Sequence, residues 1–171
     1  MNDFKTPVDS KQFAEAMYYF ASSVHIIATD GEYGKRAVTI SSCSPLSYDP
    51  PTLLVCLQKA KEANQIFLKN KSFTVNTINE SYKEFADICG GRTGASQDDR
   101  FNNSYWKKSK FGTPILDKAH LSFECVLDRH YEYGTHYILI STVLDVFKHI
   151  VDKDGGSSLP LIYSQKKYHS F

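Results

Sequence analysis

The sequence predicts a mainly β protein with short helices, arranged as an antiparallel barrel. Alternating or β-branched apolar runs form about six or seven strand-like segments, and turn residues join most of them as hairpins. The helical segments between them are short. Eleven tyrosines and eleven phenylalanines favour aromatic packing in β structure. At 171 residues the chain is expected to form a single domain spanning 1–171.

The composition excludes several classes of function. With Lys+Arg 20 against Asp+Glu 19, the net charge of +1 predicts neither a nucleic-acid partner nor a membrane surface. The chain opens without an apolar signal core, so a cytoplasmic location is expected. The four cysteines form no CxxC pair and the histidines lack ligand spacing, so we expect no metal site and no disulfide framework.

The first elements are a helix and a hairpin. Apolar residues at helical spacing predict a helix over Ser10–Ala21, capped by Asp9 or Ser10 and covering one end of the barrel. A β-branched strand follows at 23–29, and the glycine-rich turn after it leads into a strand that begins at Ala37. These two strands are expected to pair in antiparallel fashion.

Two prolines separate the next pair of strands. Pro50 and Pro51 cannot both join a ladder, so they end one strand before 52–57 begins the next. Because residues 53–57 are apolar on both faces, they predict a central strand. A short helix at about 62–68 and a strand at 73–76 follow.

The middle of the chain is helical and then irregular. Residues 81–84 have the pattern of a capping box, which predicts a helix that buries Phe85 and Ile88 and ends at Gly90. The Gly90–Gly94 run fits a helix end better than a nucleotide-binding loop. From 90 to 114 the sequence predicts a long polar loop, anchored by its aromatic residues.

Strand patterning returns in the last third of the chain. Residues 121–127 and 137–147 are predicted to be strands joined by a turn at 132–135. A second turn is expected at 152–156, before a terminal strand at 161–163.

One stretch, residues 37–67, has the chemistry of a ligand site. It combines a hydroxyl-rich strand with a cationic loop that opens a helix. Hydroxyl groups and freed backbone N–H groups suit a polyoxygenated ligand, and Lys59 and Lys61 suit its phosphate. The sequence shows no catalytic triad, no HExxH and no conspicuous carboxylate pair.

Several motifs, in order over most of the chain from Phe13 to His169, resemble the flavin reductase family. They are Phe13-x-x-Ala-Met17, Val24-x-Ile-Ile-x-Thr29, Thr39-Ile-Ser-Ser42, Asp49-Pro-Pro51, Phe73-x-Val-Asn76, Arg100-Phe101, Gly134-Thr-His136, Pro160-Leu-Ile-Tyr163 and Tyr168-His169. The family includes the reductase component of 4-hydroxyphenylacetate 3-monooxygenase.

The resemblance implies an FMN-binding split β-barrel of Greek-key type and a homodimer. It further implies an NAD(P)H:flavin oxidoreductase that transfers a hydride from NADH or NADPH to FMN or FAD. The reduced flavin would diffuse to a separate oxygenase, the partner in a two-component monooxygenase.

The same resemblance assigns roles to individual residues. His136 would lie near the flavin ring as the catalytic residue, and Phe101 and Tyr168 would wall the stacking slot. The pyrimidine edge and ribityl chain would contact Thr39, Ile40, Ser41, Ser42 and Ser44. The phosphate would be held by side chains or backbone of Gln58, Lys59, Ala60, Lys61 and Asn64.

Two departures from the family pattern leave alternatives open. Ala37 stands where members usually have glycine, and residues 58–62 lack the usual serines or threonines. An FMN-binding electron carrier or sensor with little turnover therefore remains an alternative. A relative of pyridoxamine-phosphate oxidase is a further one, although no basic cluster suits that substrate.

Overall fold

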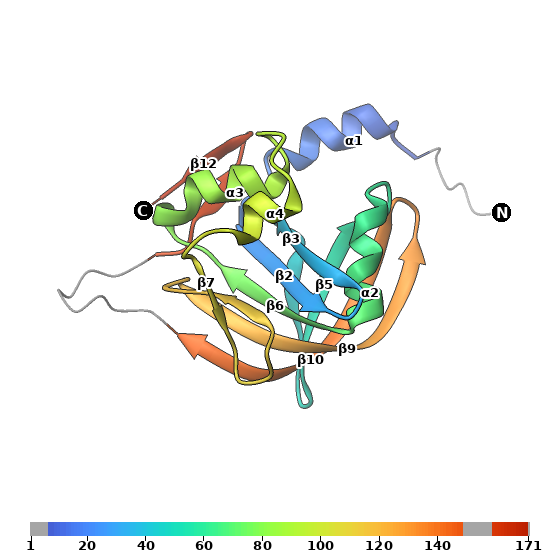
Figure 1. The fold of residues 1–171 in the computed structure, drawn as a ribbon. Coiled ribbons are helices and arrows are strands. Elements are labelled where there is room, and N and C mark those ends of the chain that lie inside the picture. Colours follow the sequence, from blue (N-terminus) through green and yellow to red (C-terminus); the bar gives the residue numbers. More distant parts are fainter. Residues whose placement is uncertain (1–6, 149–158, 171) are drawn as a thin grey trace.

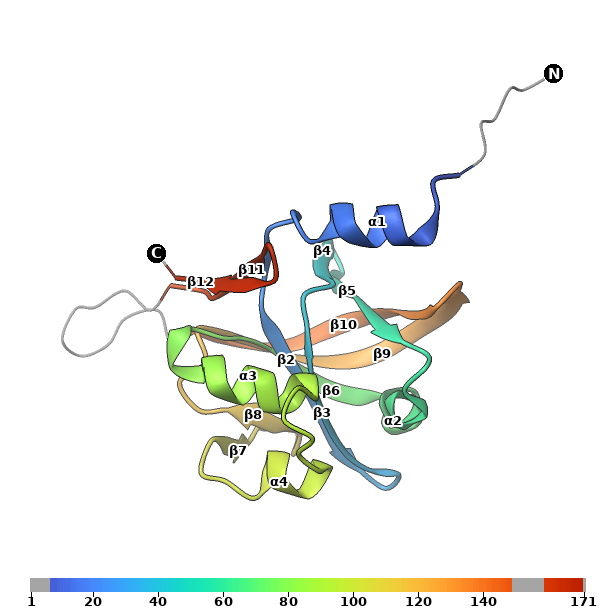
Figure 2. The same ribbon diagram turned by 90° about the horizontal axis from the view of Figure 1, so that it is seen from above.

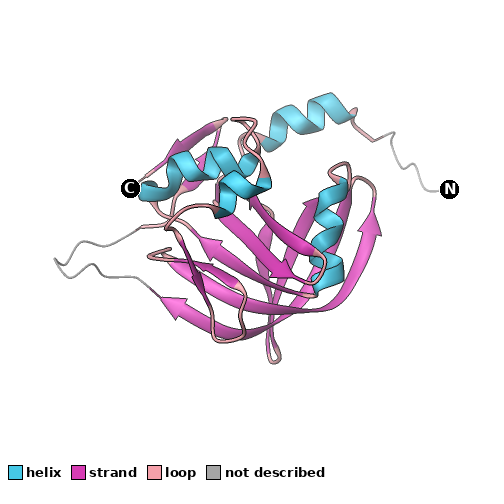
Figure 3. Ribbon diagram, viewed as in Figure 1, coloured by secondary structure: helices cyan, strands magenta, loops and turns pink. Residues whose placement is uncertain are grey.

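The computed structural model describes residues 7–148 and 159–170, which fold around one curved antiparallel sheet (Figures 1 and 3). The sheet has seven strands in the order β3-β2-β6-β9-β10-β5-β4. Along the chain these are β2 (His25–Gly31), β3 (Gly34–Ile40), β4 (Cys43–Tyr48), β5 (Pro51–Gln58), β6 (Ser72–Thr77), β9 (Leu121–Tyr133) and β10 (His136–Lys148). The predicted mainly β architecture is confirmed.

Smaller elements surround this sheet. Two minor sheets are formed by β1 (Ser22–Ser23), β11 (Ile162–Ser164) and β12 (Lys167–His169), and by β7 (Trp106–Lys108) and β8 (Pro114–Leu116). The helices are α1 (Ser10–Met17), α2 (Gln65–Asn70), α3 (Lys83–Gly90) and α4 (Gln97–Phe101), with 3-10 turns η1 (Glu62–Asn64) and η2 (Glu80–Tyr82).

The chain connection between β3 and β4 requires the sheet to curl. These strands lie at opposite edges of the sheet, yet only Ser41 and Ser42 separate them in sequence. Three Cα–Cα steps span at most about 11 Å, whereas the outer strands of a flat seven-stranded sheet lie about 29 Å apart. The sheet must therefore close on itself as a barrel, and a bond from the Cys56 N–H to the Ser42 carbonyl (2.9 Å) holds the crossing.

This crossing differs from the single hydroxyl-rich strand that the sequence predicts. The exposed Ser41 and Ser42 interrupt the ladder and divide the stretch into two strands. The predicted position of β5 away from the edges is confirmed, since it pairs with both β10 and β4. Only one of its faces is fully buried, however, because Leu54 and Cys56 remain half-exposed.

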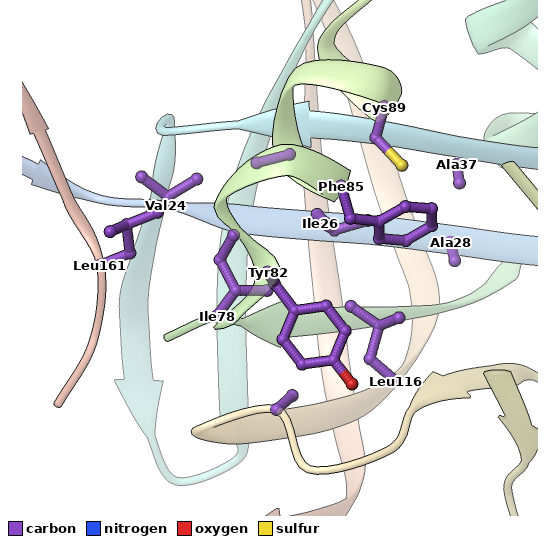
Figure 4. Packing of buried hydrophobic residues seen from close by; sticks show 12 residues of the cluster. Val24, Ile26, Ala28, Ala37, Ile78, Tyr82, Phe85, Cys89, Leu116 and Leu161 are labelled. Carbon is purple, nitrogen blue, oxygen red and sulfur yellow. The ribbon is translucent and has the colours of Figure 1, made fainter. Parts of the chain in front are cut away.

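Side chains that alternate in direction along the β2–β3 hairpin contribute to two hydrophobic cores, one on each face of the sheet. Ile26 and Ala28 face one cluster, and Ile27 faces the other. The first cluster lies between the sheet and α3, where Phe85 packs over the strands (Figure 4). The second fills the barrel and includes Phe67 and Phe73, whose rings meet edge to face at 6.1 Å. Burying each such ring contributes about 2 kcal/mol to stability.

The helical middle of the chain departs from prediction in its caps. Asn79, rather than Ser81, caps the segment, because its side chain accepts from the Ser81 N–H and a 3-10 turn precedes α3. A capping box does occur, but at Ser96 and Asp99. The predicted end of α3 at Gly90 is confirmed, and Gly91 follows with φ 81°, a left-handed conformation that suits glycine.

The expectation of an irregular loop from 90 to 114 is wrong. This segment contains α4, β7 and the start of β8. Trp106 donates its indole N–H to the Arg100 carbonyl (2.7 Å) and stacks on Phe101 with ring centroids 5.2 Å apart. Aromatic contacts thus fix short elements that have too few residues to show a periodicity.

The N-terminal helix also differs from expectation. Asp9 caps α1 as predicted, accepting from the N–H groups of Lys11 and Gln12 (2.9 and 3.0 Å). The helix ends at Met17, however, and buries none of its residues. It lies apart from the barrel (Figure 2), so the expectation that it covers a barrel end is wrong.

The predicted C-terminal strands are confirmed and are longer than expected. β9 and β10 pair over their length, and Gly134 turns between them with φ 52°. The predicted turn at 152–156 lies outside the described residues. The predicted terminal strand at 161–163 corresponds to β11, which pairs with β1 and β12.

Candidate functional site

A cavity of about 250 Å³ opens where the β3–β4 crossing meets the loop after β5. Its walls come from the end of β3, the crossing, β5 and the loop after it, the start of β10 and the end of α3. Its lining residues are Val38, Thr39, Ile40, Ser41, Ser42, Cys56, Leu57, Gln58, Lys61, Asn64, Gly90 and His136. The structure thus brings together eight of the residues that the sequence singles out, namely Thr39, Ile40, Ser41, Ser42, Gln58, Lys61, Asn64 and His136.

The β3 wall of the cavity is held by the neighbouring helices. Ala37 lies on the free edge of β3, where its N–H donates to the Gln97 side chain (2.9 Å). Its carbonyl accepts from Nη1 of Arg100 (2.8 Å), which also donates to the Cys89 carbonyl (2.8 Å). The Thr39 hydroxyl donates to the Ala86 carbonyl (2.6 Å). These bonds fix β3 against α3 and α4 immediately before the cavity.

The loop after β5 is fixed by a buried asparagine. The Asn64 side chain accepts from Nε of Arg36 (3.1 Å) and donates to the Gln58 carbonyl (2.9 Å). Both ends of its amide are therefore used within the protein. Asn64 is buried, and its bonds position the loop that carries Lys61. Asn64 therefore serves phosphate binding chiefly by holding this loop in place.

Cationic groups gather at this end of the cavity. A β-carbon at Gly91 would lie 3.7 Å from Nζ of Lys61 and 3.8 Å from Nη2 of Arg100. Burial, and next the charge of Arg100, lower the pKa of Arg36, so these two guanidinium groups also lie near one another. The buried Nε of Arg100 has no hydrogen-bond partner. An anion bound here would offset the mutual repulsion of these cations.

His136 approaches the cavity from the opposite strand. It is the first residue of β10 and pairs in register with Gln58. The Thr135 hydroxyl lies 2.8 Å from its Nδ1. The other ring nitrogen, Nε2, is thereby left for contact with a ligand.

Four of the residues singled out by the sequence line neither this cavity nor a second one that adjoins it. Lys59 pairs with Glu132 at 2.5 Å, which raises the pKa of the lysine chiefly through the hydrogen bond. Ala60 is exposed in the loop, and the exposed Ser44 donates to the Pro45 carbonyl. Phe101 packs on Trp106 within the α3 core instead of walling a slot.

A second cavity of about 200 Å³ adjoins the first, and Tyr168 lies there. It is lined by Val24, Thr39, Ile40, Ser41, Ala86, Gly90, Arg92, Tyr163 and Tyr168. The Tyr168 hydroxyl donates to Asp87 (2.9 Å). Burial and this bond raise the pKa of Tyr168, which therefore stays a neutral hydrogen-bond donor.

Sequence reasoning assigned no site role to three arginines, Arg36, Arg92 and Arg100. Arg36 and Arg100 are buried and act through neighbours, which no local pattern reveals. Arg92 had a visible signal, because it directly follows the glycines that end α3.

The site residues fit a flavin nucleotide. Hydroxyls and backbone groups of the crossing suit its polar ring edge and ribityl chain, and the cationic end suits its phosphate. Within the described residues no group of three or more His, Cys, Asp or Glu is placed to hold a metal ion. Fold and cavity together define a β-barrel protein built to bind an anionic heterocyclic nucleotide.

Comparison with known proteins makes this class specific. The chain belongs to the flavin reductase-like family, since the family model "Flavin reductase like domain" matches residues 17–171. The predicted resemblance is thereby confirmed.

Individual relatives agree over nearly the whole chain. The chain is 36% identical over 164 residues to "FMN reductase (NADH) RutF 1" of a strain of Methylorubrum extorquens, covering 96% of this chain and 78% of that protein. A crystal structure of a proposed flavin reductase from Haemophilus somnus 129PT superposes with a TM-score of 0.84 at 34% identity, covering 96% and 100% of the two chains. BorF, the flavin reductase component of a bacterial two-component tryptophan halogenase, superposes with a TM-score of 0.83 at 25% identity, covering 94% and 97%.

Proposed function

We propose that the protein is an NAD(P)H-dependent flavin reductase that reduces FMN or FAD. The observation that carries the proposal is the cavity that joins a hydroxyl-lined crossing to a cationic end. The names of the relatives, FMN reductase (NADH) among them, support the same activity. We propose that residues 1–171 form one domain that carries this activity.

The protein's part in this reaction is to bind and orient. A bound flavin supplies the redox chemistry as a hydride acceptor, so no acid or nucleophile of the chain is essential. Residues 39–42, at the end of β3 and in the crossing, would hold the ring and ribityl chain, and Lys61 would face the phosphate. His136 offers Nε2 to the ring region from β10. The hydrogen bonds that fasten β3 to α3 and α4 would keep this wall in place against a bound ring.

The product would leave for a separate oxygenase component. BorF, one of the similar structures, is the reductase of a two-component system, which supports a partner of this kind.

A homodimer is proposed as well. Its support is the exposed apolar face of the N-terminal segment, where Phe13 and Phe20 are 58% and 68% exposed. The molar mass of the purified protein, measured by light scattering during gel filtration, tests the dimer directly.

The location is proposed to be cytoplasmic. The four cysteines are free thiols in the structure, which suits a reducing compartment. Among the described residues, none of the helices is long and apolar enough to cross a membrane.

Steady-state oxidation of NADH, followed at 340 nm with and without added FMN, FAD or riboflavin, tests the activity. We expect many turnovers that depend on the added flavin. A tightly bound yellow chromophore with no turnover would instead support the alternative, an electron carrier. Repeating the assay with NADPH identifies the preferred donor.

A further inference from the structure

Thr135 connects two parts of the candidate site. Its carbonyl accepts from the Lys59 N–H (2.9 Å), which ties the turn between β9 and β10 to the loop after β5. Its hydroxyl lies 2.8 Å from Nδ1 of His136, whose side chain reaches the first cavity. Thr135 itself lines neither cavity. Any part that its side chain takes in the reaction therefore acts through His136.

The backbone restricts where this hydroxyl can lie. Thr135 follows Gly134, whose φ of 52° turns the chain from β9 into β10. The bond from the Lys59 N–H then holds the Thr135 carbonyl in place. Because a β-branched side chain has few allowed χ1 rotamers, a fixed backbone leaves the hydroxyl few positions. The contact with Nδ1 is therefore set by the turn itself.

The direction of this hydrogen bond decides which ring nitrogen of His136 carries the proton. A neutral imidazole has one N–H donor and one acceptor, and the bond made at one nitrogen selects the state of the other. In the described part of the chain, neither the ring nor the Thr135 hydroxyl has a further hydrogen-bond partner. Glu132, the carboxylate of the same hairpin, is paired with Lys59. Since Nδ1 is the protein acceptor within its reach, the hydroxyl donates to Nδ1, and the ring proton then lies on Nε2.

We propose that Thr135 is a positioning residue, whose hydroxyl donates to Nδ1 of His136 and so presents Nε2–H to the first cavity. The inference rests on the proposed function, in which His136 serves the flavin ring. A ring that accepts a hydride gains negative charge, and an N–H donor placed beside it stabilises that charge. Both electrons arrive with the hydride from the nicotinamide, and the imidazole keeps its proton. The opposite tautomer would present an acceptor at Nε2, which gives no such stabilisation.

The tautomer can be measured without turnover. In ¹⁵N-labelled protein at about pH 8.5, above the ordinary imidazole pKa of about 6.5, long-range ¹H–¹⁵N spectra distinguish protonated from unprotonated ring nitrogens. His136→Gln identifies the signals of this residue among the six histidines. We expect the proton on Nε2 in wild type. Thr135→Asp should bring a proton to Nδ1, because a carboxylate can only accept. A wild-type ring protonated at Nδ1 would overturn the proposal.

A kinetic cycle tests whether the hydroxyl acts through His136. Thr135→Val keeps the shape of the side chain and should lower kcat for NADH-dependent FMN reduction about fivefold, whereas Thr135→Ser should stay within about twofold of wild type. In a His136→Ala background, Thr135→Val should have no further effect, since the group that it positions is gone. Thr142→Val is the matched control and should leave kcat unchanged. Thr142 also lies on β10, but it donates to Asp128 (2.6 Å) and lines neither cavity.

The remaining outcomes keep this inference separate from the proposed function. An equal loss from Thr135→Val with and without His136 would mean that the hydroxyl supports the fold and not the imidazole, which refutes the positioning role. An unchanged kcat in Thr135→Val refutes it as well. Wild type that fails to turn over NADH with any flavin refutes the reductase, and the spectra still decide the tautomer. Wild type that turns over normally with its ring protonated at Nδ1 refutes this inference alone.

Discussion

Replacing Lys61 by glutamine should weaken the binding of FMN while leaving riboflavin unaffected. Lys61 lines the first cavity and approaches Gly91 beside Arg100, at the end where the phosphate is proposed to lie. Riboflavin lacks that phosphate. The difference between the two ligands therefore isolates the contribution of this lysine to phosphate binding.

The magnitude follows from the surroundings of the lysine. Opposite charges 4 Å apart attract by about 4 kcal/mol near a protein surface. Lys61 is exposed and Arg100 remains in place, so solvent and the second cation reduce the loss. We expect the Kd of FMN to rise about tenfold, which corresponds to about 1.4 kcal/mol.

Fluorescence quenching of each flavin by the protein provides the assay. Lys59→Gln is the matched control, because Lys59 pairs with Glu132 and lies outside the cavity. It should bind both flavins as wild type does. The reasoning is refuted if Lys61→Gln weakens riboflavin as much as FMN, or if Lys59→Gln has the larger effect.

Three further predictions concern activity and stability. His136→Ala should lower the rate of NADH-dependent FMN reduction tenfold or more, which corresponds to about 1.4 kcal/mol. An unaltered rate would remove His136 from the site. Arg100→Met leaves the Ala37 and Cys89 carbonyls without their donor. The free energy of unfolding in urea should therefore fall by about 3 kcal/mol. An unchanged unfolding midpoint would contradict this prediction. Burial lowers the pKa of His25 from 6.5 to about 4, so only the unfolded chain gains this proton between those values. The free energy of unfolding should fall by about 3 kcal/mol as pH drops through that window, a slope that His25→Gln should lack.

The elements that the sequence predicted well are those with a strong local signal. The β2–β3 hairpin follows from β-branched residues and a glycine turn, and the Pro50-Pro51 break follows from missing donors. The crossing at Ser41 and Ser42 was not predictable in this way. Its division into two strands depends on barrel closure, which brings distant edges together and has no local pattern.

The same distinction holds for the site. The residues near Thr39 and Lys61 were identified by their chemistry and by the resemblance, and the structure gathers most of them in one cavity. Lys59 has the same chemistry as Lys61, yet it turns to Glu132 on the β9–β10 hairpin. Arg36 acts through Asn64, a contact between residues 28 positions apart. Contacts that form only in the folded structure therefore decide which of these side chains take part in the site.

The occupant of the first cavity is the point on which every proposed role depends. A crystal structure of the protein with FMN tests it most directly. The proposal predicts flavin density against Thr39–Ser42, with the phosphate towards Lys61 and the ring within reach of His136. Flavin bound at any other place, with this cavity filled only by water, would contradict it.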